Sequence, residues 1–242
     1  MLQLVIDVGN TRTKVAVFSK SECCWDFTCN KLTVSRLKEI FKRFPKINRC
    51  LFSSVSEESE VLIDWLSKKT IFYILDAKTP LPVRIAYKNT ATLGADRKAV
   101  ACAADYLFPK NNTLIINCGT CITYDFKSAT GIYQGGSISP GLTMRLKALQ
   151  AFTARLPLVE LADPVELIGN STAQSILTGV VFGAASEIDG MIANYKAQFK
   201  HLKIVITGGD ADRLEKQLKN KIFATPNLTL IGLNHILSYI QP

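Results

Sequence analysis

The sequence predicts an α/β protein built as two similar halves, each a mixed sheet flanked by helices. An internal repeat is the main observation: the segment LVIDVGNT at residues 4–11 returns as LIINCGT at residues 114–120. Strand-like and helix-like periodicities also alternate along both halves. At 242 residues and 48% hydrophobic composition, the chain is long enough for a large core. We therefore expect two domains, residues 1–112 and 113–242.

Each copy of the repeat is expected to form a β-hairpin. In both copies an apolar run ends in a small polar turn and then resumes as a second strand-like run. Gly9 matches Gly119, and Asp7 matches Asn117. A glycine lets the backbone come close to a ligand, its neighbouring N–H groups can face phosphate oxygens, and a carboxylate can hold a cation. Two such turns are expected to hold a polyphosphate from both sides.

The remaining elements of the first half follow from the same periodicities. Pro80 and Pro82 predict a loop over residues 77–92, and Gly94 opens an alanine-rich helix that runs to about Phe108. The predicted strands are residues 2–6, 13–19, 23–28, 49–53 and 71–75, and the other predicted helices are residues 35–44 and 57–68.

The second half is predicted to repeat this plan around a glycine-rich stretch at residues 131–141. Its long helix carries Gly179 and Gly183 on one face, where small residues permit close helix contact within a subunit or across a dimer. The predicted strands are residues 113–117, 123–127 and 203–207, and the predicted helices are residues 142–151 and 171–199, a short helix after Gly209, and residues 234–240.

Composition limits the class of protein and its location. No run approaches the ~18 uncharged apolar residues of a membrane span, and Met1 leads directly into a strand, so we expect a cytoplasmic protein without a membrane partner. Seven scattered cysteines fit a reducing compartment. The net charge of +9 favours anionic ligands. Because the basic residues are spread along helices, nucleotides are favoured over nucleic acid.

Cys118 and Cys121 have the C-x-x-C spacing of some metal and redox sites. No second pair follows, and both histidines are far away in the sequence. Small residues in a tight turn are therefore the favoured interpretation, with a metal or redox role as the alternative.

Residues 7–14 combine the groups that phosphoryl transfer requires. They supply a carboxylate to anchor Mg²⁺, a glycine turn, hydroxyl and amide side chains, and a lysine. The alternative is a plain type I′ hairpin turn, which also favours Gly and Asn. The second copy of the turn favours the phosphate interpretation.

Two further motifs have a structural and a functional interpretation. Asp96, in the segment GADR at residues 94–97, can cap a helix, or it can accept a proton from a hydroxyl that attacks a phosphoryl group while Arg97 pairs with a carboxylate. The segment TGGD at residues 207–210 is either a tight strand-to-helix turn or part of a nucleotide site.

Taken together, these motifs resemble those of the type III pantothenate kinases, which belong to the superfamily of acetate and sugar kinases, Hsp70 and actin. The similarity spans essentially the whole chain, and the order of the short motifs is its most specific aspect. The matching residues are Asp7 to Thr11, Gly94 to Arg97, Gly119 and Thr120 with Thr123 and Asp125, Gly135 and Gly136, Thr153 to Pro157, Ser171 and Thr172, and Thr207 to Gly209.

The resemblance implies a duplicated ribonuclease-H-like (actin-like ATPase) fold, a homodimer, and ATP bound between the two halves. It also implies a reaction in which ATP and pantothenate give ADP and 4′-phosphopantothenate, the first step of coenzyme A biosynthesis. Asp96 is then the general base, Asp7 the Mg²⁺ anchor, and Arg97 the partner of the pantothenate carboxylate. The implied ATP-binding residues are Asp7, Val8, Gly9, Asn10, Thr11, Arg12, Thr13, Lys14, Thr120, Gly208 and Gly209, and the implied pantothenate-binding residues are Tyr87, Gly94, Ala95, Asp96, Arg97 and Thr172.

Asn117 departs from the family pattern, which usually has an aspartate there. The aspartate is associated with a monovalent cation, K⁺ or NH₄⁺. Asparagine offers a carbonyl oxygen without the charge that strengthens cation binding. The expected cofactors are thus ATP with Mg²⁺ and a monovalent cation.

Two other functions remain as alternatives to pantothenate phosphorylation. One is another small-molecule kinase or phosphohydrolase of the same superfamily, because the phosphate turns do not identify the acceptor. The other is a nucleotide-binding accessory factor for transcription without catalysis. The presence of Asp7, Asp96 and Arg97 disfavours an inactive enzyme, and no helix-turn-helix motif is apparent.

Overall fold

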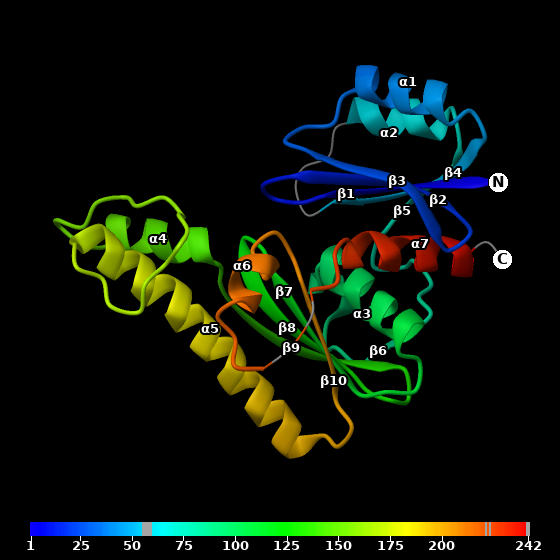
Figure 1. Ribbon diagram of the computed structural model, residues 1–242. Coiled ribbons are helices and arrows are strands. Elements are labelled where there is room, and N and C mark those ends of the chain that lie inside the picture. Colours follow the sequence, from blue (N-terminus) through cyan, green and yellow to red (C-terminus); the bar gives the residue numbers. More distant parts are fainter. Residues whose placement is uncertain (55–59, 221, 223, 241–242) are drawn as a thin grey trace. The chain divides into compact units, whose positions relative to one another are not determined.

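The computed structural model describes residues 1–54, 60–220, 222 and 224–240 (Figure 1). The chain forms two compact units. Unit 1 comprises residues Met1–Lys110, Thr130–Gln134 and Asn227–Pro242, and unit 2 comprises residues Asn111–Ala129 and Gly135–Pro226. The predicted domains, residues 1–112 and 113–242, describe the two duplicated halves of the sequence. This division stays a prediction.

Unit 1 is built on a five-stranded sheet in the order β3-β2-β1-β4-β5. Strands β1, β2 and β3 form an antiparallel meander, whereas β4 runs parallel to β1 and β5 runs parallel to β4. The elements of unit 1 are β1 (Leu2–Val8), β2 (Thr13–Ser19), β3 (Glu22–Cys29), α1 (Val34–Arg43), β4 (Ile47–Ser54), α2 (Glu60–Ser67), β5 (Ile71–Ile74), β6 (Arg84–Ile85), a 3₁₀ turn at Thr90–Thr92, α3 (Ala95–Leu107) and α7 (Leu228–Ile240).

Alternation along β1 divides unit 1 into two cores. Leu4 and Ile6 pack against α1 and α2 on one face of the sheet. Val5 points to the opposite face, where the core includes residues of α3 and α7. Figure 1 shows α1 and α2 on one side of this sheet and α7 on the other. Helices α3 and α7 pack extensively on each other, and α7 also contacts β1 and β4. Asp7 is two residues after Val5, so it lies on the same face as Val5, near the end of β1.

Unit 2 repeats the arrangement of the first four strands. The second sheet has the order β10-β7-β8-β9-β6, in which β7 and β8 are an antiparallel hairpin and β10 runs parallel to β7. The order β9-β8-β7-β10 therefore matches β3-β2-β1-β4, and the predicted duplicated fold is confirmed. The remaining elements are β7 (Thr113–Cys118), β8 (Cys121–Lys127), β9 (Ile132–Pro140), α4 (Leu142–Ala151), α5 (Thr172–Gln198), β10 (Lys203–Thr207) and α6 (Ala211–Glu215). All belong to unit 2 except the start of β9, up to Gln134, which belongs to unit 1.

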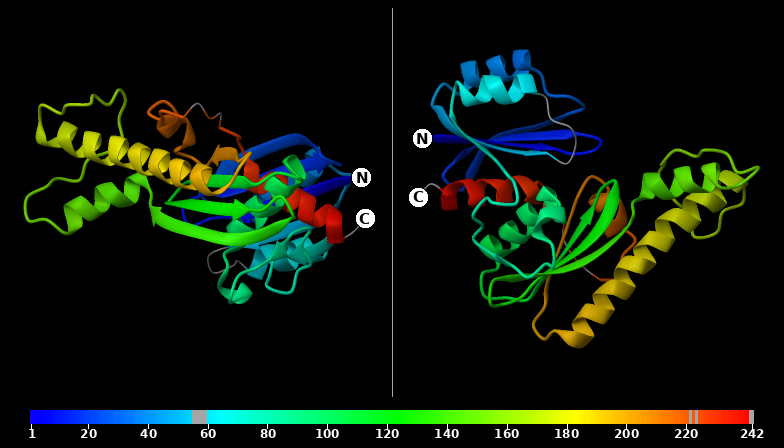
Figure 2. Two further views of the ribbon diagram at one scale, coloured as in Figure 1. Left: turned by 90° about the horizontal axis from the view of Figure 1, so that it is seen from below. Right: turned by 180° about the vertical axis from the view of Figure 1, so that it is seen from behind.

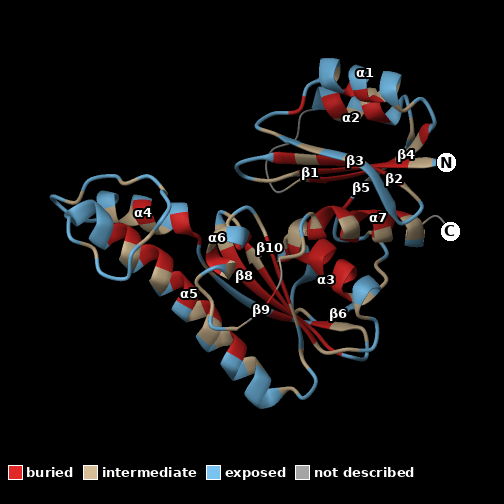
Figure 3. Cartoon of the chain, viewed as in Figure 1, coloured by how far each residue is buried: buried red, intermediate tan, exposed pale blue. Residues whose placement is uncertain are grey.

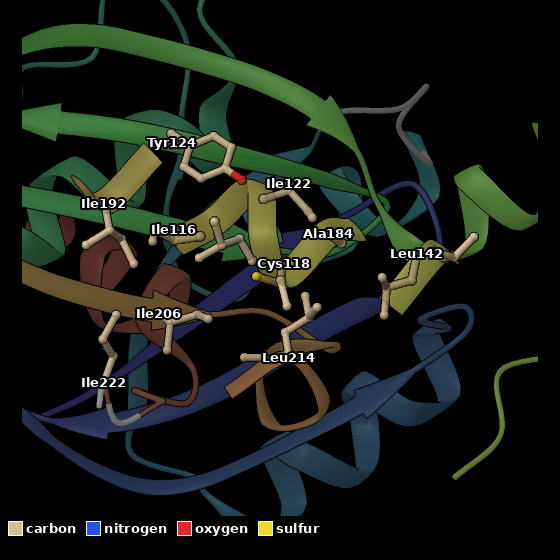
Figure 4. Packing of buried hydrophobic residues seen from close by; sticks show 14 of the residues in the cluster. Ile116, Cys118, Ile122, Tyr124, Leu142, Ala184, Ile192, Ile206, Leu214 and Ile222 are labelled. Atoms are coloured by element: carbon tan, nitrogen blue, oxygen red, sulfur yellow. The ribbon is translucent and has the colours of Figure 1, made fainter. Parts of the chain in front are cut away.

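The core of unit 2 lies between its sheet and helices α4, α5 and α6. Ile116, Cys118 and Tyr124 of the hairpin pack with Ala184 and Ile192 of α5 (Figure 4). Helices α4 and α5 run side by side in all views (Figures 1 and 2). One face of α5 is buried along its length and the other is exposed (Figure 3).

Helix α5 is the one helix of the described residues that is long and apolar enough to cross a membrane by length and composition, with a mean hydropathy of 1.5 over an 18-residue window. The sequence-based criterion, which required an uncharged run, did not detect it. Eight of its residues are buried within the protein. Packing in the core of unit 2 therefore accounts for its apolar composition.

Two sequence-based predictions of local structure were wrong, and one strand was not predicted. The glycine-rich stretch, which received no assignment, forms strand β9. The predicted loop 77–92 contains β6, which pairs in parallel with the start of β9. The C-terminal helix begins at Leu228 and not at residue 234. The predicted start of helix α2 at residue 57 lies outside the described residues. Glycine disfavours strands locally, so β9 depends on pairing with distant segments that periodicity does not reveal.

Candidate active site

The first hairpin turn, residues 9–12, connects β1 to β2. Val8 pairs with Thr13, and the Gly9 N–H donates to the carbonyl of Arg12 over 3.0 Å. No residue of this turn has a positive φ. The type I′ alternative, which needs φ > 0 at both central residues, therefore does not occur. Asn10, Thr11 and Arg12 are exposed, whereas Val8, Gly9 and Lys14 are partly buried and Thr13 is buried.

Asp7 is a buried carboxylate at the end of β1. It is 8% exposed, pairs in register with Lys14, and accepts a hydrogen bond from Ser53 Oγ of β4 over 3.3 Å. Burial raises the pKa of Asp7 from 3.8 to about 6, and the negative charge of Asp96 adds to the increase, while Lys14 and Ser53 oppose it. The carboxyl group thus loses much of its hydration and would gain from a bound cation.

Asp96 lies in the first turn of α3, directly after the N-cap residue Gly94 and Ala95. Its Oδ1 accepts the backbone N–H of Arg97 over 2.8 Å, and the Gly94 carbonyl accepts the N–H of Lys98. Gly94, and not Asp96, is therefore the N-cap residue, while Asp96 accepts one backbone N–H of the first turn. The same carboxylate also lies close enough to Asp7 for its negative charge to raise the pKa of Asp7.

Arg97 is 6% exposed and lies against two tyrosine rings. Its Cζ is 6.0 Å from the ring centroid of Tyr87 and 5.9 Å from that of Tyr133. The sequence motifs included Tyr87 but missed Tyr133, which stands in the glycine-rich stretch that was not predicted to be a strand. An aromatic residue within that stretch was the only local signal for finding it.

The second hairpin turn is shorter than the first. Cys118 pairs with Ile122, so the turn comprises residues 119–121, and the Gly119 N–H donates to the carbonyl of Cys121 over 3.0 Å. Thr120 is exposed at its tip. Asn117 is partly buried and lies opposite Thr123, whose hydroxyl donates to Asp125 over 2.8 Å. The two copies of the repeat are therefore similar in backbone plan and different in length and charge.

The structure brings the Gly208 turn next to the second hairpin. Gly208 has a φ of +105°, and a Cβ there would lie 2.2 Å from the Cys118 carbonyl oxygen. The Asp210 N–H donates to that oxygen over 3.0 Å, and Gly209 is exposed. Only glycine can follow this backbone path against Cys118.

Gly141 supports the same turn from another direction. Its N–H donates to the Thr120 carbonyl over 3.1 Å, and a Cβ at this position would lie 2.2 Å from the Gly119 carbonyl oxygen. The sequence analysis did not assign Gly141 to the site. Contact with a turn 20 residues earlier is a tertiary feature without a local sequence signal.

A hydrogen-bond network around Glu187 of α5 holds this region together. Glu187 accepts from Tyr124 Oη over 2.8 Å, from Ser139 Oγ over 2.9 Å, and from Arg145 Nη2. Arg145 Nε also donates to the Pro140 carbonyl over 2.8 Å. Burial works to raise the pKa of Glu187, but the hydrogen bonds from Arg145, Tyr124 and Ser139 outweigh it, so the pKa lies below its ordinary value. The network thus fixes the residues just before Gly141.

Cys118 of the C-x-x-C pair does not have the properties of a reactive thiol. All seven are free thiols. Burial, with the charges of Asp210 and Glu187, raises the pKa of Cys118 from 9.0 to about 12, so its thiol is protonated at neutral pH. No group of three or more His, Cys, Asp or Glu in the described ranges is arranged to hold a metal ion.

The predicted site residues thus form two sets. Asp7 to Lys14, Tyr87 and Gly94 to Arg97 belong to unit 1, whereas Asn117, Thr120, Thr172, Gly208 and Gly209 belong to unit 2. Thr172 is exposed at the start of α5, whose N-cap is Ser171.

Comparison with known proteins identifies the family. The family model described as "Type III pantothenate kinase" matches residues 3–194. The type III pantothenate kinase of Christiangramia forsetii is 43% identical over 239 residues, which cover 98% of both chains. The chain belongs to the type III pantothenate kinase family.

Solved structures support the fold expected for this family. A conserved protein from Campylobacter jejuni, assigned to the Baf family of transcriptional activators, matches with a TM-score of 0.60 and 21% identity over 98% of both chains. A glucokinase from an Antarctic psychrotroph matches with a TM-score of 0.55 and 13% identity, covering 98% of this chain and 99% of the glucokinase. At these identities the likeness concerns the fold alone. The fold is that of the actin-like ATPases and sugar kinases, as the resemblance implied.

Proposed function

We propose that this type III pantothenate kinase family member transfers the γ-phosphoryl group of ATP to the primary hydroxyl of pantothenate. The products are ADP and 4′-phosphopantothenate, and the reaction is the first step of coenzyme A biosynthesis. The observation that carries this proposal is the arrangement in unit 1, where the carboxylate of Asp7 is buried within the electrostatic influence of Asp96, and Asp96 precedes Arg97. A cation anchor, a proton acceptor and a carboxylate partner are thus available together.

The residues of the first hairpin fit ATP with a divalent metal. MgATP, when bound, supplies the phosphoryl group and the charge that balances the phosphate oxygens. Asp7 would hold the Mg²⁺, because a buried carboxylate with a raised pKa gains more from a cation than a hydrated one does. The exposed turn residues Asn10, Thr11 and Arg12 would donate hydrogen bonds to phosphate oxygens, with Val8, Gly9, Thr13 and Lys14 completing this segment.

Asp96 is the proposed general base. Because Oδ1 already accepts the Arg97 N–H, we propose that the other carboxylate oxygen, Oδ2, accepts the proton of the pantothenate hydroxyl. A modest base is sufficient, because phosphoryl transfer depends mainly on positioning. Arg97 would pair with the carboxylate of pantothenate, and Tyr87, Gly94, Ala95 and Thr172 would line the substrate.

The second hairpin is proposed to bind ATP through Thr120, with Gly208 and Gly209 near the adenosine. The close packing of Gly208 and Gly141 on this turn supports a fixed geometry. Asn117 is the proposed position of the monovalent cation, K⁺ or NH₄⁺. Its neighbours in the hairpin include Thr123, which is hydrogen-bonded to Asp125, so oxygen ligands are present on this strand pair.

We also propose a homodimer formed along α5. The exposed positions Gly179, Gly183, Ser186, Gly190 and Ala193 follow one face of the helix at i, i+4, i+7, i+11 and i+14. An added Cβ at any of the three glycines meets nothing within 4 Å. Large apolar side chains are also exposed in the segment that connects α4 to α5, among them Phe152, which is 88% exposed, and Ile168, which is 83% exposed. An exposed apolar surface beside a stripe of small residues suits close packing of a second copy.

The enzyme is proposed to act in the cytoplasm without nucleic-acid or membrane partners. The free thiols suit a reducing compartment. The alternative of a non-catalytic transcription factor receives no support from the Campylobacter structure, because that likeness concerns the fold alone. Binding to duplex DNA that weakens steeply with salt would favour the alternative.

One assay tests the proposed function. The protein is incubated with MgATP, with and without pantothenate and with and without K⁺, and ADP release is followed. Release that depends on pantothenate is the expected result. Release that is indifferent to pantothenate would indicate another acceptor, and absence of release under all conditions would favour the non-catalytic alternative.

A further inference from the structure

The guanidinium of Arg97 rests on two aromatic rings that come from different segments of unit 1. The two rings, Tyr87 and Tyr133, have centroids 6.4 Å apart, and the Arg97 Cζ is 6.0 and 5.9 Å from them. Because these three lengths are nearly equal, the guanidinium lies to one side of both rings and not between them. Both contacts are at the cation–π distance of about 6 Å.

Burial makes these contacts important for the charge. Arg97 is 6% exposed, and Tyr133 is fully buried. A buried guanidinium has lost most of its water, and the negative faces of aromatic rings offset part of that loss. The rings also restrict a side chain that otherwise carries considerable rotamer entropy.

Strand pairing fixes the two rings side by side. Ile85 of β6 pairs with Tyr133 of β9, and the Ala86 N–H donates to the Tyr133 carbonyl over 2.9 Å. Tyr87 is therefore held just beyond this pairing, next to the Tyr133 ring. Arg97 comes from the first turn of α3, one residue after Asp96.

We propose that Tyr133 is a positioning residue for substrate binding, which orients Arg97 toward the substrate carboxylate. The proposal rests on the proposed role of Arg97 as the carboxylate partner. A fully buried ring cannot touch the substrate, so Tyr133 acts through Arg97 alone. Tyr87, in contrast, is partly exposed and has a proposed contact of its own with pantothenate.

The expected consequence is a selective effect on pantothenate binding. A guanidinium that is already oriented and partly desolvated pairs with a carboxylate at a lower entropic cost. Without the Tyr133 ring, Arg97 would sample other rotamers, and the KM for pantothenate would rise. The KM for ATP would stay unchanged, because the Tyr133 ring acts only on Arg97, which is proposed to bind pantothenate and not ATP.

The test compares Tyr133→Leu, which removes the ring, with Tyr133→Phe, which keeps the ring and removes the hydroxyl. We expect Tyr133→Leu to raise the KM for pantothenate about tenfold and Tyr133→Phe to change it less than twofold. The KM for ATP should change less than twofold in both. With the analogue that has a primary alcohol in place of the carboxylate, wild type and Tyr133→Leu should have the same KM.

Two further measurements keep the proposal falsifiable if Tyr133→Leu does not fold. Fluorinated phenylalanines at position 133 keep the shape of the ring and weaken its negative face, so the KM for pantothenate should rise with each added fluorine. In the double variant Arg97→Gln/Tyr133→Leu, the second substitution should add no further effect on the KM.

Specific outcomes would overturn the proposal. A KM independent of fluorination, equal effects on ATP and pantothenate, or additive effects in the double variant would leave Tyr133 a structural residue only. An unchanged KM for pantothenate in Arg97→Gln would remove the role of Arg97 and with it that of Tyr133. Failure of the proposed function itself is recognised separately, because wild type would then release no ADP in response to pantothenate.

Discussion

Asp96 lies close enough to Asp7 in unit 1 that its negative charge, together with burial, raises the pKa of Asp7. The two carboxylates are 89 positions apart in the sequence and come from the end of β1 and the start of α3. Two like charges near each other are unfavourable without a cation between or beside them. The two carboxylates have different environments, since Asp7 is buried and Asp96 is partly exposed. This difference suits separate roles, with Asp7 as the Mg²⁺ anchor and Asp96 as the general base.

Asp7→Asn is predicted to stabilise the metal-free protein and to abolish its Mg²⁺-dependent activity. The raised pKa means that Asp7 favours folding in its protonated form. This contribution is complete below pH ~4 and is lost as the pH rises through about 6. Above pH 6 the ionised group costs up to about 3 kcal/mol, which the asparagine avoids.

The measurement is thermal unfolding in EDTA at pH 7.5 and pH 5.0. The variant should unfold at a higher temperature than wild type at pH 7.5, and the difference should narrow at pH 5.0. A variant less stable than wild type at pH 7.5 would contradict the prediction that ionised Asp7 destabilises the metal-free protein.

Asp96→Asn is predicted to retain ATP binding and to lower turnover by about 10²-fold or more, because the amide cannot accept the hydroxyl proton. Asp64→Asn, on the exposed face of α2, is the matched control and should leave turnover unchanged. Steady-state ADP release and ATP binding by calorimetry measure the two effects. Near-normal turnover in Asp96→Asn would exclude Asp96 as the base.

Asn117→Asp is predicted to strengthen activation by K⁺, because a carboxylate binds a cation more strongly than an amide oxygen does. The half-maximal K⁺ concentration for ADP release should fall in the variant. A K⁺ titration identical to that of wild type would remove position 117 from the cation site.

Glu187→Gln is predicted to destabilise unit 2 by about 1–2 kcal/mol at neutral pH, because it removes the charge from the hydrogen bonds with Arg145, Tyr124 and Ser139. A lowered pKa means that the wild-type stabilisation is present above pH ~4.5 and is lost as the pH falls further. Urea unfolding at pH 7.5 and pH 4 should show a gap between the two proteins that closes at the lower pH. A gap of equal size at both values would indicate a packing effect instead of a charge effect.

Gly183→Leu is predicted to convert the proposed dimer to a monomer without unfolding it. An added side chain at Gly183 meets open space within the chain, so the fold should tolerate it, whereas a close helix contact with a second copy would not. Sedimentation velocity measures the mass, and circular dichroism checks the fold. Ser35→Leu, at an exposed position of α1, is the control for an added apolar side chain. A wild-type protein that sediments as a monomer would contradict the dimer itself.

The sequence by itself determined the duplicated plan and most of its elements. The bounds of β2, α4 and β10 match the predicted ranges, since strong local periodicity and turn residues define each of them. The repeat located both hairpins, because an apolar strand followed by a glycine turn is a local pattern. The ordered motifs also led to the correct family.

Tertiary structure alone decided how these parts form a site. Strand β9 exists because β6 and β8 pair with it, against the local preference of its glycines. The proximity of Asp96 to Asp7, the two rings on Arg97, and the packing of Gly141 on Thr120 join segments that lie far apart in the sequence. Such contacts depend on which strands and helices meet in three dimensions. Periodicity reports only which face of a single element is buried, so it does not determine them.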